Sequence, residues 1–191
     1  MAYLAVTLAF FIFFIMGCGT TSPIAGPDRT QVGEIYTVDP QIKWSRFYRR
    51  NIEIWTVDGP SLEAIYFVKG IDPDETLVAT NEEEKWPKFD PDMTANEIME
   101  LIIDSLARTG YTQLQPHHLR PEIFGSLKGF RFDFDFLYQD GLEGQGLVTG
   151  TIIENKLYLI LYIGTRQHYF SKYLDEVNKI IKSIRLSLEK N

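Results

Sequence analysis

The chain has a single cysteine, Cys18, among its 191 residues. One cysteine cannot form a disulfide bond within the chain, so the fold has to be stabilised by packing and hydrogen bonds. Histidine is scarce as well, with three residues, and no charged side chain occurs before Cys18. The only thiol of the chain therefore directly follows an uncharged N-terminal segment.

The net charge of −7 leaves the chain without the clustered cations that bind a phosphate backbone, so we expect no nucleic-acid partner. The acidic residues concentrate between Asp72 and Asp92, where eight acidic side chains accompany two lysines. We interpret this segment as a solvated loop. It lacks the alternating ligands and central glycine of a calcium-binding loop, so we expect no calcium there.

The N-terminal segment predicts export and a lipid anchor. As a helix, its first sixteen residues would reach about 24 Å, which is less than the thickness of the hydrocarbon core of a bilayer, about 30 Å. This length favours a signal peptide over a membrane span. Ile15-Met16-Gly17-Cys18 resembles a bacterial lipobox. In such signals a peptidase cuts before the cysteine, here between Gly17 and Cys18, and the thiol and the new amino group are acylated. The segment departs from the usual signal because no lysine or arginine precedes it.

These features divide the chain into three parts. We expect a lipoprotein signal peptide over 1–17, a lipidated N-terminus with a flexible tether over 18–33, and a single domain over 34–191. The tether rests on the Gly, Pro, Ser and Thr content of 19–33. The acylated Cys18 would attach the chain to a bilayer of the cell envelope, on the periplasmic face of the outer membrane in a host with two membranes. An uncleaved anchor or a buried structural cysteine is the alternative.

The domain alternates strand and helix patterns. Strand-rich runs cover 33–38, 51–57 and 61–70, and Asp58-Gly59 predicts a hairpin whose loop is lengthened by Pro60. Thr94 and Glu97 form the capping-box pattern that begins a helix over 95–108, which Gly110 ends. A second amphipathic pattern predicts a helix from about Phe170 to Ile184.

Three further strands are expected between the helices. The stretch KGFRFDFDFLYQDG alternates phenylalanine with charged residues, and GLVTGTII and LYLILYIG follow after short turns. The last of these runs is apolar on both faces and therefore needs cover on both sides. The predicted fold class is α+β, an αβα sandwich with a mostly antiparallel β-sheet flanked by helices.

Two stretches resemble the PsbP-like fold: MTANEIMELIIDSLARTG and KLYLILYIGTRQHYFSKYLDEVNKIIKSIRLSL. This fold is shared by the photosystem extrinsic protein PsbP, a Ran-binding nuclear import factor and mycobacterial lipoproteins of the LpqN type. The motif EIWTVDG adds a resemblance to a group of bacterial lipoproteins with such a domain. The resemblance implies a protein-binding or assembly role rather than an enzyme, and it transfers no active-site residue.

No residue pattern predicts catalysis or a cofactor. His117 and His118 are adjacent, so in an extended strand they would point to opposite sides, and we expect exposed histidines at a strand edge without a metal. Ser126 and Lys128 lack a nucleophile elbow. The glycines of 141–146 precede a strand rather than a helix, which favours a hairpin turn over a phosphate site.

Asp133 and Asp135 share one strand face at roughly 7 Å, a spacing also found between glycosidase carboxylates. Alternating charges on the solvated face of a sheet explain the same pattern, and we favour that explanation.

One segment combines cations with aromatics: Lys43-Trp44-Ser45-Arg46-Phe47-Tyr48-Arg49-Arg50. Such a segment can contact anionic headgroups or a polyanionic polymer of the envelope, and equally can be an edge strand protected by its cations. The candidate surface-binding residues are Lys43, Trp44, Arg46, Arg49 and Arg50.

The sequence thus predicts a lipid-anchored, non-catalytic module that binds a protein or another envelope component. The alternative is a small-ligand carrier or hydrolase that uses a pocket between sheet and helices.

Overall fold

The computed structural model describes residues 24–26, 28–80 and 85–187. The two helices of this part of the chain are α1 (Ala95–Arg108) and α2 (Tyr169–Lys182). Its strands are β1 (Ile24–Ala25), β2 (Thr30–Val32), β3 (Tyr36–Val38), β4 (Trp44–Arg49), β5 (Ile52–Thr56), β6 (Glu63–Ile71), β7 (Thr112–Phe124), β8 (Leu127–Leu137), β9 (Glu143–Ile153), β10 (Lys156–Thr165) and β11 (Arg185–Leu186). Neither α1 nor α2 is long and apolar enough to cross a membrane.

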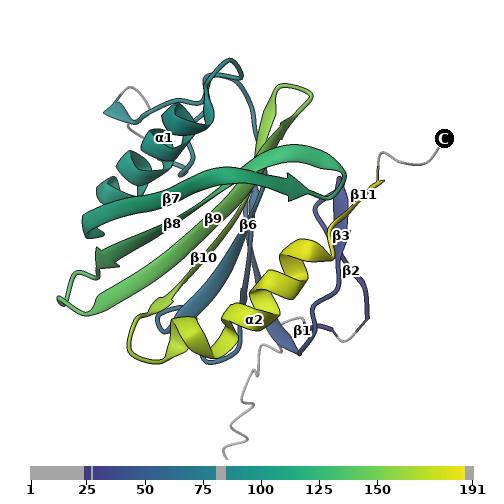
Figure 1. Cartoon of the computed structure of the whole chain (residues 1–191), viewed down its shortest axis with the longest axis vertical. Coiled ribbons are helices and arrows are strands. Elements are labelled where there is room, and N and C mark those ends of the chain that lie inside the picture. The colour runs from purple at the N-terminus through teal and green to yellow at the C-terminus, as the bar shows by residue number, and fades with distance from the viewer. Residues whose placement is uncertain (1–23, 27, 81–84, 188–191) are drawn as a thin grey trace, which may run out of the picture.

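The strands form an eight-stranded sheet in the order β1-β4-β5-β6-β10-β9-β8-β7, and a smaller sheet in the order β11-β3-β2. All strand pairs are antiparallel. The large sheet lies between α1 and α2, and the small sheet lies beside the C-terminal end of α2 (Figure 1). The expected α+β sandwich with helices on both faces is therefore confirmed.

The central strand β10 separates two hydrophobic cores. Its side chains alternate, so that Leu159 packs in the core beneath α1 and Ile160 packs in the core beneath α2. Both are buried. This arrangement is the cover on both faces that the apolar run LYLILYIG requires.

Helix α1 begins and ends where its sequence pattern predicts. The Thr94 hydroxyl accepts the backbone N–H of Glu97, and the Glu97 carboxylate accepts the backbone N–H of Thr94. The helix ends at Arg108, and Gly110 follows with a φ of 106°. A left-handed residue at this position suits glycine, which has no Cβ to clash.

The alternating phenylalanines of β8 all face α1. Phe134 lies opposite Gly146 and Phe136 lies opposite Gly144 on the neighbouring strand β9. A Cβ at either glycine would lie within 2.3 Å of the facing ring, so these positions admit glycine alone without rearrangement. The expectation that the glycines of 141–146 form a turn is wrong for these two, which are strand residues. Gly141 does lie in the turn, with a φ of 84°.

The expected flexible tether over 18–33 is wrong for its second half. Ala25 pairs with Trp44 across β1 and β4, and Val32 of β2 pairs with Tyr36 of β3. Ala25 and Val32 are both buried in the core beneath α2. The fold therefore includes residues from Ile24 onward, and strands of two or three residues are too short to show a period in the sequence.

Strand β7 is an element that the sequence pattern did not indicate. It contains Pro116 and Pro121, and its register against β8 shifts twice. Proline cannot donate to a strand ladder and is tolerated at a sheet edge, and β7 is the edge strand beyond β8.

The motif EIWTVDG ties the β5–β6 hairpin to its surroundings. Glu63 of β6 accepts the Thr56 hydroxyl at 2.7 Å and the backbone N–H of Val57 at 2.6 Å. The Asp58 carboxylate accepts the ammonium of Lys172 at 2.6 Å and the phenol of Tyr173 at 2.7 Å, both on α2. The motif thus has a structural role in this chain.

Asp58 makes the stability of the fold depend on pH. The donors Lys172 and Tyr173 hold the pKa of its carboxyl below the ordinary value. The stability that the Asp58 carboxylate contributes is therefore fully present above its unfolded-state pKa of about 3.9. It is lost as the pH falls through the lower pKa that this carboxyl has in the folded state. We expect Asp58→Asn to lower Tm by about 1–3 °C at neutral pH, because exposed ion pairs contribute little.

Thermal melts of both proteins at several pH values check this prediction. The Tm difference should shrink below about pH 3. Asp104→Asn on the exposed side of α1 is the matched control and should shift Tm by less at every pH. An equal Tm deficit of Asp58→Asn at neutral and at acidic pH would contradict the prediction.

Candidate functional site

The predicted lipidation site, with Gly17 and Cys18, lies outside the described residues. The candidate site of the described domain is instead a pocket between α1 and the sheet. Its volume is about 260 Å³. It is lined by Ile52, Tyr66, Val68, Leu77, Val78, Ile102, Leu106, Thr109, Tyr111, Val148, Leu159, Leu161 and Ile163.

This pocket exists because side-chain size changes along the sheet. The large phenylalanines of β8 fill the space between α1 and the sheet. On the central strands the residues facing the same side are smaller, such as Val68 and Val148, and leave a volume that α1 does not fill. Leu77 and Val78 of the long β6–α1 connection close one side.

The pocket is almost free of polar groups. The hydroxyl of Thr109 donates to the carbonyl of Leu106 at 2.7 Å and is occupied there. Two phenols remain, those of Tyr66 and Tyr111, and neither makes a hydrogen bond to another described residue. Burial raises the pKa of both phenols above the ordinary value, so they stay neutral at any physiological pH. They can hydrogen-bond one polar atom of an otherwise apolar ligand.

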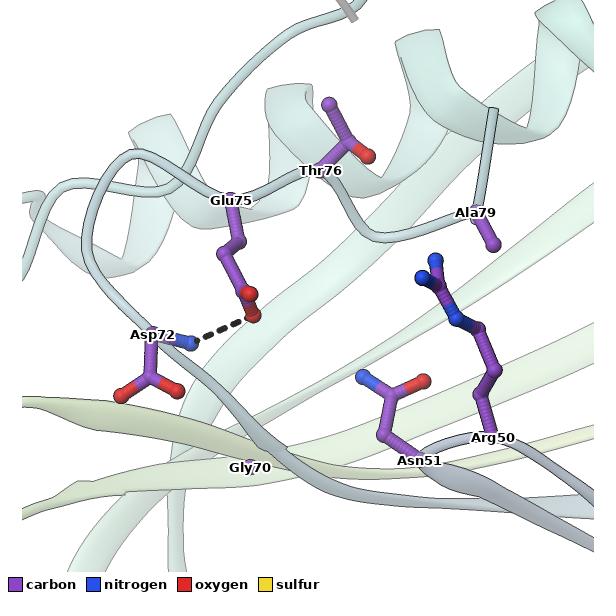
Figure 2. A pocket seen from close by; sticks show the side chains of 7 residues that line it. All are labelled: Arg50, Asn51, Gly70, Asp72, Glu75, Thr76 and Ala79. Carbon is purple, nitrogen blue, oxygen red and sulfur yellow. Dashed lines mark hydrogen bonds between the residues drawn. The ribbon is translucent and has the colours of Figure 1, made fainter. Parts of the chain in front are cut away.

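A second, polar pocket of about 380 Å³ lies beside the segment 76–79, and Figure 2 shows the side chains that line it. Thr76 and Ala79 line this polar pocket, whereas the intervening Leu77 and Val78 line the apolar one. The remaining lining residues are Arg50, Asn51, Gly70, Asp72 and Glu75.

Arg50 is the basic residue in the lining of the polar pocket that could pair with an anionic ligand. Its side chain rises from the β4–β5 turn beside that of Asn51 (Figure 2), and it has no ion pair with any described residue. Neither acid of this pocket pairs with Arg50: Asp72 pairs with Lys156 at 2.9 Å, and Glu75 accepts the backbone N–H of Asp72 at 3.2 Å within the pocket. An anionic group can therefore approach Arg50 and Asn51.

The structure divides the predicted basic and aromatic segment. Trp44 is buried, and its indole N–H donates to the carbonyl of Pro40, so it does not belong to a binding surface. Arg46 is paired with the buried Glu53. Lys43, Arg49 and Arg50 remain exposed. The side chains of Phe47 and Tyr48, which are 38% and 50% exposed, lie between them in the sequence.

The other candidates lie outside both pockets. Ser126 and Lys128 are exposed at the turn between β7 and β8. Asp133 accepts Arg120 at 3.0 Å, and Asp135 accepts Gln145 at 3.1 Å, so the two carboxylates are engaged separately. The histidines differ from the expectation, because a bulge brings both imidazoles to one side, where their Nδ1 atoms lie 3.0 Å apart.

Sequence patterns did not reveal the apolar pocket. Its lining residues are the ordinary apolar positions of strands and a helix, and nothing in their spacing distinguishes a filled core from an unfilled one. Such an arrangement can bind an apolar group, but no lining residue carries a carboxylate, an imidazole or a thiol that would serve as a general base.

No family model and no curated protein sequence matches the chain. Solved structures do match, among them the following two. The solution structure of cyanobacterial PsbP (CyanoP) from Synechocystis has a TM-score of 0.56 at 13% identity, covering 89% of this chain and 95% of that one. The crystal structure of LpqN, involved in cell envelope biogenesis of Mycobacterium tuberculosis, has a TM-score of 0.46 at 9% identity, covering 90% and 87%. By its similarity to CyanoP, this chain has a PsbP-like fold.

Proposed function

We propose that this chain is a lipid-anchored protein of a bacterial cell envelope whose PsbP-like domain binds an amphipathic envelope component without catalysing a reaction. The apolar pocket beneath α1 carries the proposal. At about 260 Å³ it is close to the lower end of the range of typical ligand sites, roughly 300–1,000 Å³. Apolar cavities of about 150 Å³ already bind small hydrocarbons.

The polar pocket supports an amphipathic rather than a purely apolar ligand. One short segment, 76–79, separates the two pockets, so an acyl chain beneath α1 would place its polar end near Arg50 and Asn51. An anionic headgroup would compensate the unpaired charge of Arg50. The neutral phenols of Tyr66 and Tyr111 would meet any polar atom along the chain of the ligand.

The short connection to the predicted anchor supports a position close to the bilayer. Ile24 already belongs to the fold, so only five residues lie between it and Cys18, and the six Cα–Cα steps reach at most about 20 Å when extended. Strand β1 pairs with the start of β4, whose exposed Phe47, Tyr48 and Arg49 follow. Aromatic and cationic side chains of this kind interact favourably with an anionic membrane surface.

Titration of the purified full-length protein with a fluorescent fatty acid tests the binding site. We expect saturable binding to the wild type. Val148→Phe places a ring in the pocket and should weaken binding by about tenfold or more, because the volume for the ligand is lost. Val57→Phe adds the same ring at an exposed position of the β5–β6 loop and should bind as the wild type does.

Two results would reject the binding proposal. One is the absence of saturable binding to the wild type, and the other is unchanged binding by a Val148→Phe protein that melts as the wild type does. Recovery of a specific protein partner from crosslinked native envelope, with no lipid in the native mass spectrum, would favour a protein-binding module instead.

Mass spectrometry of the protein from its native envelope tests the anchor separately. We expect a chain that begins at Cys18 and carries the added mass of acyl groups. A chain that retains residues 1–17 with an unmodified thiol would reject the lipid anchor and the envelope location inferred from it.

A further inference from the structure

We propose that His117, His118 and Asp133 form a binding site for a divalent transition-metal ion of the zinc class. The three residues lie at the edge of the sheet, on β7 and β8, away from the pockets beneath α1. One ligand atom from each lies within 4.8 Å of the others. Two imidazole nitrogens and a carboxylate oxygen are a donor set that zinc prefers, and that calcium and magnesium do not.

A β-bulge creates this geometry. The register of β7 against β8 shifts between His117 and Arg120, and His118 has a φ of 56°. Consecutive residues of a regular strand point to opposite faces, but the left-handed residue turns the second imidazole to the side of the first. Left-handed backbone is uncommon for residues other than glycine, and such outliers concentrate at functional sites.

The interatomic distances suit a metal ion between the ligands. The Nδ1 atoms of His117 and His118 lie 3.0 Å apart, and the Nδ1 of His118 lies 3.6 Å from the carboxylate of Asp133. Ligand atoms at about 2.0–2.2 Å from a tetrahedral zinc ion lie roughly 3.3–3.6 Å from one another. Small side-chain adjustments would therefore complete the site.

Hydrogen bonds to neighbouring side chains orient the imidazole of His117. Its Nε2 lies 3.3 Å from the carboxylate of Asp135, whose other oxygen accepts the amide of Gln145 at 3.1 Å. A histidine that donates one ring N–H to a carboxylate has the lone pair of its other nitrogen available, and this carboxylate–histidine–metal arrangement is typical of zinc sites. The neighbouring strand β8 thus supplies both carboxylates, Asp133 as a ligand and Asp135 as the partner of His117.

Two arginines oppose the binding of a cation. Arg120 donates to the carboxylate of Asp133 at 3.0 Å, and the Nε of Arg131 lies 3.8 Å from the other oxygen of that carboxylate. A bound metal ion would replace the first of these interactions. Removal of Arg120 should therefore strengthen metal binding at Asp133. A metal ion bound elsewhere on the chain would not respond to this variant.

Three protein ligands leave one tetrahedral position for water or an external donor. A cavity of about 270 Å³ adjoins the cluster and is lined by His117, Asp133 and Gln145, together with Phe170 and Leu174 of α2. Space for an external ligand is therefore present beside the open coordination position.

Titration of the full-length chain with zinc sulfate, followed by calorimetry, tests the site. The chain should carry Cys18→Ser, because a free thiolate would itself bind zinc. We expect one zinc ion per chain. His118→Ala and Asp133→Asn should each weaken binding by about 100-fold, and Asp135→Asn by about 10–100-fold. Arg120→Ala should tighten it, and His168→Ala, which removes the remaining histidine at the start of α2, should leave it unchanged.

In the same Cys18→Ser chain, cobalt(II) gives a readout that needs no further variant. Tetrahedral coordination by two imidazoles and a carboxylate should produce visible absorption bands, which zinc should abolish by displacement. Absence of both zinc heat and cobalt bands would overturn the proposal. So would retention of wild-type affinity by a folded His117→Ala, His118→Ala double variant.

Discussion

Phe132→Ala is expected to lower the free energy of unfolding by about 3–5 kcal/mol. Phe132 lies in the middle of β8, is fully buried in the core beneath α1, and faces Val148 on β9. Removal of its ring would lose the transfer free energy of the aromatic group and would leave a cavity next to the existing apolar pocket. Partial collapse of α1 into that space would place the loss at the lower end of the range.

Urea unfolding followed by circular dichroism measures this loss. The matched control is Ile123→Ala on β7, whose side chain is 57% exposed, and it should change stability by less than about 0.5 kcal/mol. If Phe132→Ala is no less stable than Ile123→Ala, the phenylalanines of β8 do not form the core beneath α1.

Glu53→Ala is expected to cost about 3–5 kcal/mol, because it breaks a buried charge pair and leaves the partner uncompensated. Glu53 is buried, with 1% of its surface exposed. Its carboxylate accepts hydrogen bonds from the indole N–H of Trp55 and from the guanidinium Nε–H of Arg46, each at 2.7 Å. The guanidinium also lies over the rings of Tyr48 and Trp55. Alanine would orphan two donors at once.

Two further variants separate the charge from the hydrogen bonds. Glu53→Gln keeps an acceptor for both donors and should lose less stability than Glu53→Ala. Combined Arg46→Met and Glu53→Met should recover only part of the loss: apolar replacement of a complete buried pair is often nearly neutral, but the buried indole N–H of Trp55 stays without its acceptor. A Glu53→Ala protein within about 1 kcal/mol of the wild type in urea unfolding would show that Arg46 is solvated rather than dependent on Glu53.

The two pockets and the histidine cluster differ in how far the sequence could have revealed them. The histidines were visible as a pair, but their common orientation depends on the bulge between His117 and Arg120. That bulge follows from pairing with β8, a strand whose register is dominated by the burial of its phenylalanines. The polar pocket depends on Arg50, which was noted as a cation without its neighbours Asn51 and Glu75.

The segment around Arg46 shows that residues which a sequence pattern groups together can have different environments in the fold. As a sequence it combines cations and aromatics, and five of its residues were candidates for one surface: Lys43, Trp44, Arg46, Arg49 and Arg50. The register of β4 against β5 places Arg46 opposite Trp55 and beside Glu53, while Trp44 packs against Tyr173 of α2. A helix far along the chain therefore covers Trp44, whereas the neighbouring strand β5 engages Arg46.

Local sequence signals were enough to specify the main helices and strands. The capping box of α1, the amphipathic pattern of α2, the alternation of β8 and the two-faced apolarity of β10 each depend on residues a few positions apart, and together they predict both helices and the antiparallel sheet. Other features depend on contacts between distant segments: the inclusion of 24–26 and 28–33 in the fold, the edge position of β7, the apolar volume beneath α1 and the meeting of His117, His118 and Asp133. These features depend on strand register and on how well distant side chains fill a shared space, and neither quantity is encoded in local periodicity.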